Sequence, residues 1–345
     1  MAHRATRLPP VGVREEDVLT ERSCAAGTVD RPASGRSDQG ILDAVFERLP
    51  EFRGLSRQVD QLPGGLTNRI YRVTAPSGHT VVARLASGKS ALLAIDRNAE
   101  CHNSKAAARA GVGPEVIACE PAEGVSVVEW IAGRTFAAAD LDDSAQLARI
   151  AATCNRLHHG PRFINDFDMF AIQRGYLAIV RERGFRLPAR YLDFLPQVEH
   201  IRAALAVRDE GTVPCHNDLL AANIMDDGER IWFIDYEYAG NNDPCFELGN
   251  IWSESTLDLD RLDELVTDYH GYRSRAKLAR ARLFALMSKY GWTLWASIQD
   301  AVSEVDFDFW SWGQEKYDRA VAEFDGPEFF SLIEEVQQPN QPRGS

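Results

Sequence analysis

Three polar side chains in the second half of the chain have the types and the order that phosphoryl transfer requires. Asp218 lies five residues before Asn223, and Asp235 directly follows the apolar run 231–234. Transfer of a phosphoryl group from ATP needs a carboxylate that accepts the proton of the attacking hydroxyl, and oxygen ligands that hold Mg²⁺ on the phosphates. We therefore expect Asp218 to be the base, and Asn223 and Asp235 to be ligands of Mg²⁺.

A simpler interpretation is that residues 226–228, Asp-Asp-Gly, form an ordinary hairpin turn with Asp218 and Asp235 as its polar flanks. A hairpin does not account for the loop before it, which has the order H-x-D-x-x-x-x-N. Glu237 is a further candidate for an outer-sphere contact with the metal. The pattern favours a phosphotransferase.

The segments 216–223 (H-N-D-L-L-A-A-N) and 234–240 (I-D-Y-E-Y-A-G) resemble the catalytic segment of the choline/ethanolamine kinase family. That family is a branch of the aminoglycoside phosphotransferase group, which has a protein-kinase-like fold. The resemblance implies the roles given above, and it implies that His216 shapes the loop rather than taking part in the reaction. It also implies an α+β bilobal fold, with a small N-lobe of antiparallel sheet plus helix and a larger, mainly helical C-lobe.

The elements that must cover the nucleotide lie near the start of the chain. Alternating β-branched residues predict antiparallel strands at 59–62, 70–74 and 80–85. The loop P-G-G-L-T-N at 63–68 joins the first two strands, where a kinase-type fold closes over the phosphates. Taken alone, a Gly-Gly turn is usually only a hairpin. With the catalytic motif, we expect phosphate contacts from the residues Gly64, Gly65, Thr67 and Asn68.

A cation for the α and β phosphates is expected on the third strand. Arg84 is the only charged residue of 80–85, and the resembling family also uses Arg there. A helix is predicted over 92–110, in which Glu100 can pair with Arg84 and hold it. Asp96 is the competing partner.

Strands at 115–119 and 125–130 complete the predicted N-lobe. The sequence E-W-I-A-G that follows resembles the hinge between lobes, so we expect the adenine edge to meet Glu129, Trp130 and Ile131. The expected division is a disordered tail at 1–39, an N-lobe at 40–130, a C-lobe at 131–333 and a disordered tail at 334–345.

Beyond residue 240, the resembling family has an acidic residue that supports the backbone of the catalytic loop from below. Glu247 is the first candidate for this role, and Asp243 is the second. The adjacent His158 and His159 point in different directions, which makes them a poor pair of metal ligands. The aromatic and basic segment 161–192 has no clear period.

The helix predicted over 281–299 carries the argument about the substrate. Its aliphatic residues share one face, whereas Trp292, Trp295 and Gln299 gather on the opposite face. Two indoles one turn apart attract an ammonium group through the ring quadrupole. The resemblance implies that Trp292, Trp295 and Glu254 bind the cationic end of the substrate, with Trp312 as a further aromatic wall. The alternative is a helix packed between two core layers.

Composition restricts the class of protein. The chain has 345 residues, 45% of them hydrophobic, and a net charge of -13, which argues against a nucleic-acid partner and favours cationic substrates. No run of about 18 apolar residues predicts a membrane span. Six cysteines without metal spacing predict reduced thiols in the cytoplasm. The sequence leaves open whether the chain forms a homodimer.

These observations predict a kinase that uses ATP and Mg²⁺ to phosphorylate the hydroxyl of choline or a related amino alcohol, with choline as the first candidate. An aminoglycoside phosphotransferase would use the same three polar residues but would need a roomy acidic cleft. A catalytically silent module that binds a cation is the alternative from a different class. The presence of Asp218, Asn223 and Asp235 together argues against that alternative.

Overall fold

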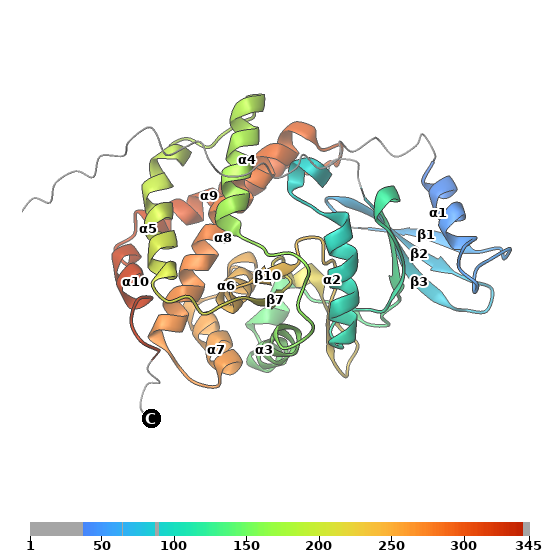
Figure 1. Ribbon diagram of the computed structural model, residues 1–345, viewed down its shortest axis with the longest axis horizontal. Helices are drawn as coiled ribbons and strands as arrows, with labels where there is room; N and C mark the ends of the chain where they lie inside the picture. The colour runs from blue at the N-terminus through green and yellow to red at the C-terminus, as the bar shows by residue number, and fades with distance from the viewer. Residues whose placement is uncertain (1–36, 64, 87–89, 341–345) are drawn as a thin grey trace, which may run out of the picture.

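The structure, a computed structural model, describes residues 37–63, 65–86 and 90–340, which form two lobes of unequal size (Figure 1). The N-lobe contains a five-stranded antiparallel sheet in the order β1-β2-β3-β5-β4. Its strands are β1 (Gln58–Leu62), β2 (Asn68–Thr74), β3 (Thr80–Ala86), β4 (Val116–Glu120) and β5 (Val125–Glu129). The five predicted strands and the two-lobed α+β class are confirmed.

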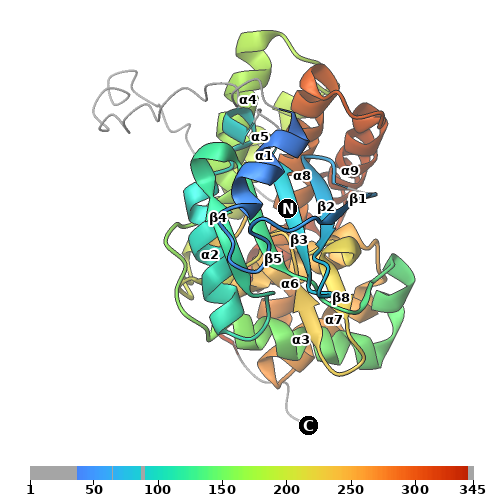
Figure 2. The same cartoon turned by 90° about the vertical axis from the view of Figure 1, so that its right-hand side faces the viewer.

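Helix α1 (Asp38–Phe46) covers one face of this sheet (Figure 2). Leu42, Val45 and Phe46 of the helix pack with sheet residues such as Val81 and Val127 in a separate N-lobe core. Burial of these aliphatic and aromatic groups stabilises the small sheet. The N-lobe can therefore present its opposite face to the C-lobe.

The connection between β1 and β2 contains a residue that must be glycine. Gly65 has a φ of 86°, and a Cβ atom there would lie 2.4 Å from the carbonyl oxygen of Asn68. Only glycine tolerates both the positive φ and this approach. Gly64, the other glycine predicted to contact phosphate, lies outside the described residues.

Helix α2 (Arg97–Arg109) begins later than the predicted position 92. Residues Ser90–Leu93 form a 3-10 turn, and the Asp96 carboxylate then accepts hydrogen bonds from the amides of Asn98 and Ala99. Asp96 is therefore the N-cap of α2 and not the partner of Arg84.

One cysteine pair departs from the expectation of reduced thiols. Cys101 of α2 and Cys119 of β4 form a disulfide, with their Cα atoms 6.1 Å apart. A separation of 18 residues is not a sequence pattern that indicates a disulfide. The two cysteines come together because α2 packs beside β4. Cys154, Cys215 and Cys245 are free and buried.

The C-lobe is built around α8 (Arg275–Val302), whose 28 residues are mostly buried. Gly249 of α6 (Pro244–Glu254) lets α6 and α8 approach closely, because a Cβ atom there would lie 2.2 Å from the carbonyl oxygen of Ala281. The helices of this lobe are α3 (Ser144–His158), α4 (Met169–Arg183), α5 (Leu195–Ala206), α6 (Pro244–Glu254), α7 (Leu259–His270), α8 (Arg275–Val302), α9 (Phe309–Phe324) and α10 (Phe329–Glu335). The segment 161–192, for which no period was found, contains α4.

Besides the N-lobe sheet, the described residues form two small antiparallel sheets. Strand β7 (Val213–Cys215) pairs with β10 (Gly240–Asn242), and β8 (Ile224–Asp226) lies between β6 (Arg134–Thr135) and β9 (Ile231–Phe233). The predicted hairpin at 226–228 is the β8–β9 turn. Because these sheets carry the loops before β8 and after β9, they determine where the predicted catalytic residues lie.

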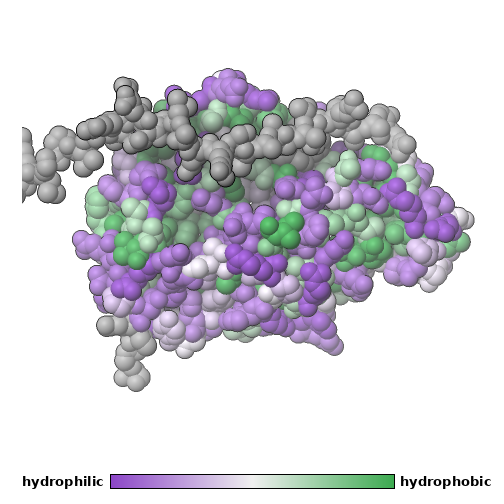
Figure 3. Space-filling model, viewed as in Figure 1, coloured by the Kyte–Doolittle hydropathy of each residue, from purple (hydrophilic) through white to green (hydrophobic). Residues whose placement is uncertain are grey.

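The ordered chain continues past residue 334, where the C-terminal tail was expected to begin. Helix α10 ends at Glu335, and the carbonyl of Gln337 accepts a hydrogen bond from Arg208. No described helix has the length and apolar character needed to cross a membrane. The face shown in Figure 3 is mainly hydrophilic, with apolar residues in separate patches.

Candidate active site

A single cavity of about 820 Å³ brings together most of the predicted site residues. It extends from the hinge at Glu129–Ile131 past the catalytic loop to the tryptophans of α8 and α9. The predicted residues that line it are Gly65, Thr67, Arg84, Glu100, Glu129, Trp130, Ile131, Asp218, Asn223, Asp235, Glu254, Trp292, Trp295 and Trp312. Asn68 and Gln299 are not among its lining residues. Gln299 is buried and donates a 3.5 Å hydrogen bond to the carbonyl of Leu66.

The catalytic loop follows β7 and has an unusual backbone. Asn217 has a φ of 67°, in the left-handed region that Asn tolerates better than most residues. Its side-chain amide donates to the carbonyls of Tyr238 and Gly240, each at 3.1 Å. These contacts fix the loop to the segment after β9, so that Asp218 and Asp235 are positioned by one network.

Glu247 of α6 supports this loop from below. Its two carboxylate oxygens accept hydrogen bonds from the backbone amides of His216, at 2.9 Å, and Asn217, at 2.7 Å. Burial opposes ionisation of Glu247, but contact with His158 and the amide of His216 outweighs it and lowers the pKa of Glu247. Asp243, the second candidate for this role, instead caps α6 and pairs with Arg280 at 2.6 Å.

His216 lies behind the loop, with its ring buried. Its Nε2 donates to the carbonyl of Ile234 at 2.8 Å, and its Nδ1 accepts from the amide of Asp218 at 3.3 Å. Burial lowers the pKa of His216, which favours the neutral ring that these two bonds require. The geometry is that of a loop-shaping residue, as the resemblance implied.

The two predicted metal ligands both line the cavity but have different surroundings. The side-chain amide of Asn223 donates to the carbonyl of Asp218 at 2.8 Å, which leaves its oxygen available. Asp235 has a φ of 68° and pairs with Arg84. Oxygen donors of this kind suit Mg²⁺, and both line the cavity beside Asp218.

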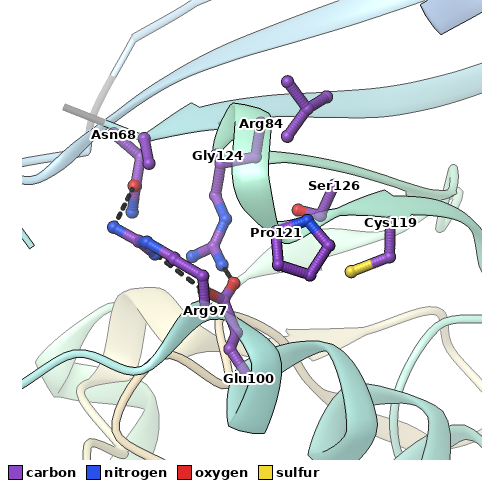
Figure 4. A pocket seen from close by; sticks show the side chains of 10 residues that line it. Asn68, Arg84, Arg97, Glu100, Cys119, Pro121, Gly124 and Ser126 are labelled. Carbon is purple, nitrogen blue, oxygen red and sulfur yellow. Dashed lines mark hydrogen bonds and ion pairs between the residues drawn. The ribbon is translucent and has the colours of Figure 1, made fainter. Parts of the chain in front are cut away.

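Arg84 also pairs with Glu100 of α2, the partner predicted for it (Figure 4). Sequence reasoning missed Arg97, which lies in the same network. Its guanidinium contacts Glu100 at 2.7 Å and Glu237 at 3.2 Å. One turn of helix separates Arg97 from Glu100, a spacing that could have identified it.

Thr67 and Asn68 make contacts that differ from those expected. The Thr67 hydroxyl donates to Glu237 at 2.7 Å, and the Asn68 amide donates to the other Glu237 oxygen at 2.9 Å. All three side chains are buried. Glu237 therefore anchors Thr67 and the start of β2 to the C-lobe, and contact of these two side chains with phosphate stays a prediction.

The carboxylate of Asp218 is partly buried in a strongly acidic environment. Burial raises its pKa well above the usual value, and the charges of Glu254, Asp235 and Glu237 raise it further. The ammonium of Lys316 acts in the opposite direction. A raised pKa moves a carboxylate towards the range in which it can accept a proton from an alcohol near neutral pH.

Four aromatic residues and one carboxylate line the end of the cavity away from the hinge. We call this end the tryptophan pocket, and its residues are Tyr238, Glu254, Trp292, Trp295 and Trp312. The Trp295 indole donates to the Tyr238 hydroxyl at 2.8 Å, and its ring meets that of Trp312 edge to face at 5.6 Å. Tyr238 and Trp292 meet edge to face at 4.9 Å. The two tryptophans of α8 thus line a cavity, although both are more than nine-tenths buried.

Lys316 of α9 is the residue near this pocket that sequence reasoning missed. Its ammonium contacts a carboxylate oxygen of Glu254 at 2.5 Å and lies 4.2 Å from the centre of the Trp312 ring. Lys316 is four residues after Trp312 on α9, so a helical projection could have placed them together.

Comparison with known proteins agrees with this geometry. A choline/ethanolamine kinase family model matches residues 59–281. The protein LicA of Haemophilus influenzae is 26% identical to this chain, and the match covers 79% of this chain and 79% of LicA. Mouse ethanolamine kinase 2 is also 26% identical, and the match covers 78% of this chain and 77% of the mouse protein. The crystal structure of a choline/ethanolamine kinase family protein from Mesorhizobium loti is 30% identical, has a TM-score of 0.75, and is matched over 87% of this chain and 99% of that one.

Kinase-like structures of lower identity share the fold, among them a macrolide 2'-phosphotransferase with a TM-score of 0.54. The match of the family model covers more than half of the chain. The protein is therefore an enzyme, a phosphotransferase with an alcohol acceptor, and the chain belongs to the choline/ethanolamine kinase family.

Proposed function

We propose that the protein transfers the γ-phosphoryl group of ATP to the hydroxyl of choline or a related amino alcohol. The observation that carries this proposal is the continuity of one cavity, which joins the hinge, the three polar residues of the catalytic segment and the tryptophan pocket. A nucleotide at the hinge end and a small cationic alcohol at the aromatic end would meet beside Asp218.

In this proposal Asp218 accepts the proton of the substrate hydroxyl. The raised pKa of its carboxylate, caused first by burial, suits that task. The His216 ring and the Glu247 carboxylate hold the loop so that Asp218 is positioned before substrate arrives. Asn223 and Asp235 would hold Mg²⁺, which neutralises charge on the phosphates when bound.

Arg84 is the proposed contact of the α and β phosphates. Its guanidinium is already oriented by Glu100, which is in turn held by Arg97. The backbone of Glu129–Ile131 is the proposed contact of the adenine edge, because this segment lines the cavity directly after β5.

The tryptophan pocket supports a small ammonium substrate over an aminoglycoside. An aminoglycoside has several ammonium groups and would need several exposed carboxylates, whereas this end of the cavity presents indole faces and Glu254. A silent cation-binding module is disfavoured because the base and both metal ligands line the same cavity.

The experiment that tests the proposal measures ATP consumption and phosphorylated product with choline, ethanolamine, kanamycin and a neutral alcohol of similar size. We expect product from the amino alcohols alone. Product from kanamycin alone would support the aminoglycoside alternative, and equal product from the neutral alcohol would show that the acceptor need not be cationic.

A further inference from the structure

An ammonium group of the protein contacts two residues of the tryptophan pocket, although Lys316 itself is not among the lining residues. The Lys316 ammonium pairs with one oxygen of Glu254, Oε2, and lies over the face of Trp312. The side chains of Lys316 and Glu254 are each only 4% exposed. One oxygen of the Glu254 carboxylate and one face of the Trp312 indole are therefore already in contact with a cation.

The second oxygen of Glu254 is in a different state. Oε1 is buried and has no hydrogen-bond partner among the described residues, although Glu254 lines the cavity. A buried charged acceptor without a donor is costly, so such a group is normally satisfied by a ligand or by water. What this oxygen lacks is a hydrogen-bond donor, which a positive charge alone does not provide.

From these contacts we infer that the acceptor site selects ammonium groups that carry at least one N–H bond, and that it discriminates against quaternary ammonium. The inference rests on the proposed function and concerns the same site. A primary, secondary or tertiary ammonium can donate to Glu254 Oε1 while Lys316 keeps Oε2. A trimethylammonium group has no N–H, so it would leave Oε1 unsatisfied, while Oε2 would remain paired with Lys316. This order departs from the sequence expectation that choline is the best substrate.

A series of substrates that differ by one methyl group tests the inference on the unmodified enzyme. Ethanolamine, N-methylethanolamine, N,N-dimethylethanolamine and choline lose N–H donors one at a time while their size increases in equal steps. We expect modest changes in kcat/KM over the first three and a fall of about tenfold or more at the last step, where the final donor is lost. If only the size of the ammonium group limited binding, kcat/KM would instead decline gradually over the four substrates.

Replacement of Lys316 tests the role of the internal ammonium. Lys316→Met frees Oε2 and the face of Trp312, so the ratio of kcat/KM for choline to that for ethanolamine should rise by about tenfold. Lys289→Met is the matched control, because Lys289 is also buried, pairs with Glu323 and lies 5.2 Å from the Trp252 ring. Neither Glu323 nor Trp252 is among the residues that line the cavity. This control should leave the ratio unchanged even if it destabilises the fold.

The outcomes separate the two claims. If none of the four alcohols is phosphorylated, the proposed function fails, and the inference fails with it. If choline is phosphorylated as well as or better than N,N-dimethylethanolamine, the inference is overturned while the proposed function stands. An equal change of the ratio in Lys316→Met and Lys289→Met would also overturn the role given to Lys316.

Discussion

Arg84 of the N-lobe pairs with Asp235, the C-lobe carboxylate that we expect to hold Mg²⁺. The pair joins β3 to the segment after β9 across the cavity. Because the guanidinium occupies the carboxylate, Mg²⁺ must compete with Arg84 unless a nucleotide supplies other partners for the arginine. If Asp235 holds Mg²⁺ and Arg84 contacts the nucleotide as proposed, this contact would couple metal binding to nucleotide binding.

We predict that Mg²⁺ alone stabilises the protein little, whereas saturating MgATP raises the midpoint of thermal unfolding by about 5 to 10 °C. In Arg84→Met, Mg²⁺ alone should produce a clear shift, since Asp235 loses its competitor. Differential scanning calorimetry measures both shifts. Arg72→Met is the control, because Arg72 pairs with Asp60 at the outer strand β1. A full shift with Mg²⁺ alone in the unmodified protein would contradict the coupling.

The pH dependence of turnover should reveal the acidic surroundings of Asp218. Burial, and then the charges of Glu254, Asp235 and Glu237, raise the pKa of Asp218. Because a general base works only when it is deprotonated, the acidic limb of the kcat/KM profile should lie at higher pH than is usual for an aspartate. Lys316 lowers the pKa of Asp218, and Lys316→Met should therefore move this limb to still higher pH. A limb that stays at the same pH in the variant would refute the electrostatic account.

The support under the catalytic loop predicts a loss of stability. Glu247→Ala leaves the amides of His216 and Asn217 buried without acceptors, which should lower the free energy of unfolding by about 2 to 5 kcal/mol. Urea denaturation measures this change. Glu199→Ala, which removes an exposed ion pair with Arg202, should cost less than about 1 kcal/mol.

The ionisation of Glu247 adds a test by pH. Because the folded-state pKa of Glu247 is lowered, its contribution is present above the unfolded-state pKa and is lost as pH falls through the folded-state value. The difference in stability between the unmodified protein and Glu247→Ala should shrink at acid pH. A difference that does not change with pH would show that the carboxylate charge has no part in the support.

The tryptophan pocket should distinguish cationic from neutral alcohols. Trp295→Ala is expected to raise KM for an ammonium alcohol by about 2- to 30-fold and to change KM for a neutral alcohol much less. Steady-state kinetics on the two substrates measures the difference. Trp310→Ala is the control, because Trp310 stacks with Arg186 at 3.8 Å and is not among the residues that line the cavity. Equal effects of Trp295→Ala on both alcohols would remove the cation argument.

The sequence predicted those parts of the site that depend on short-range order. Asp218 and Asn223 lie on one loop, and Asp235 ends the next ribbon, so local spacing was enough to group them. The pairing of Arg84 with Glu100 followed from the expected positions of one strand and one helix. Individual strands and helices followed from a period of two or a helical period, whereas the two-lobed architecture was implied by the resemblance to the kinase family.

Other contacts could not be predicted because they join residues far apart in the chain. Thr67 and Asn68 bond to Glu237, 170 and 169 residues away, which no local pattern encodes. The Cys101–Cys119 disulfide likewise depends on how α2 lies beside β4. Lys316 was missed because the aromatic residues of α9 were considered without the charges on the same helical face.

Phosphorus NMR of the reaction of ATP with ethanolamine tests the central claim most directly, with the unmodified enzyme compared with Asp218→Asn. We predict an O-phosphorylated amino alcohol from the unmodified enzyme, and a fall in its rate of about a hundred- to ten-thousandfold in the variant with nucleotide binding retained. Phosphorylated product at an undiminished rate from Asp218→Asn would contradict the assignment of Asp218 as the base.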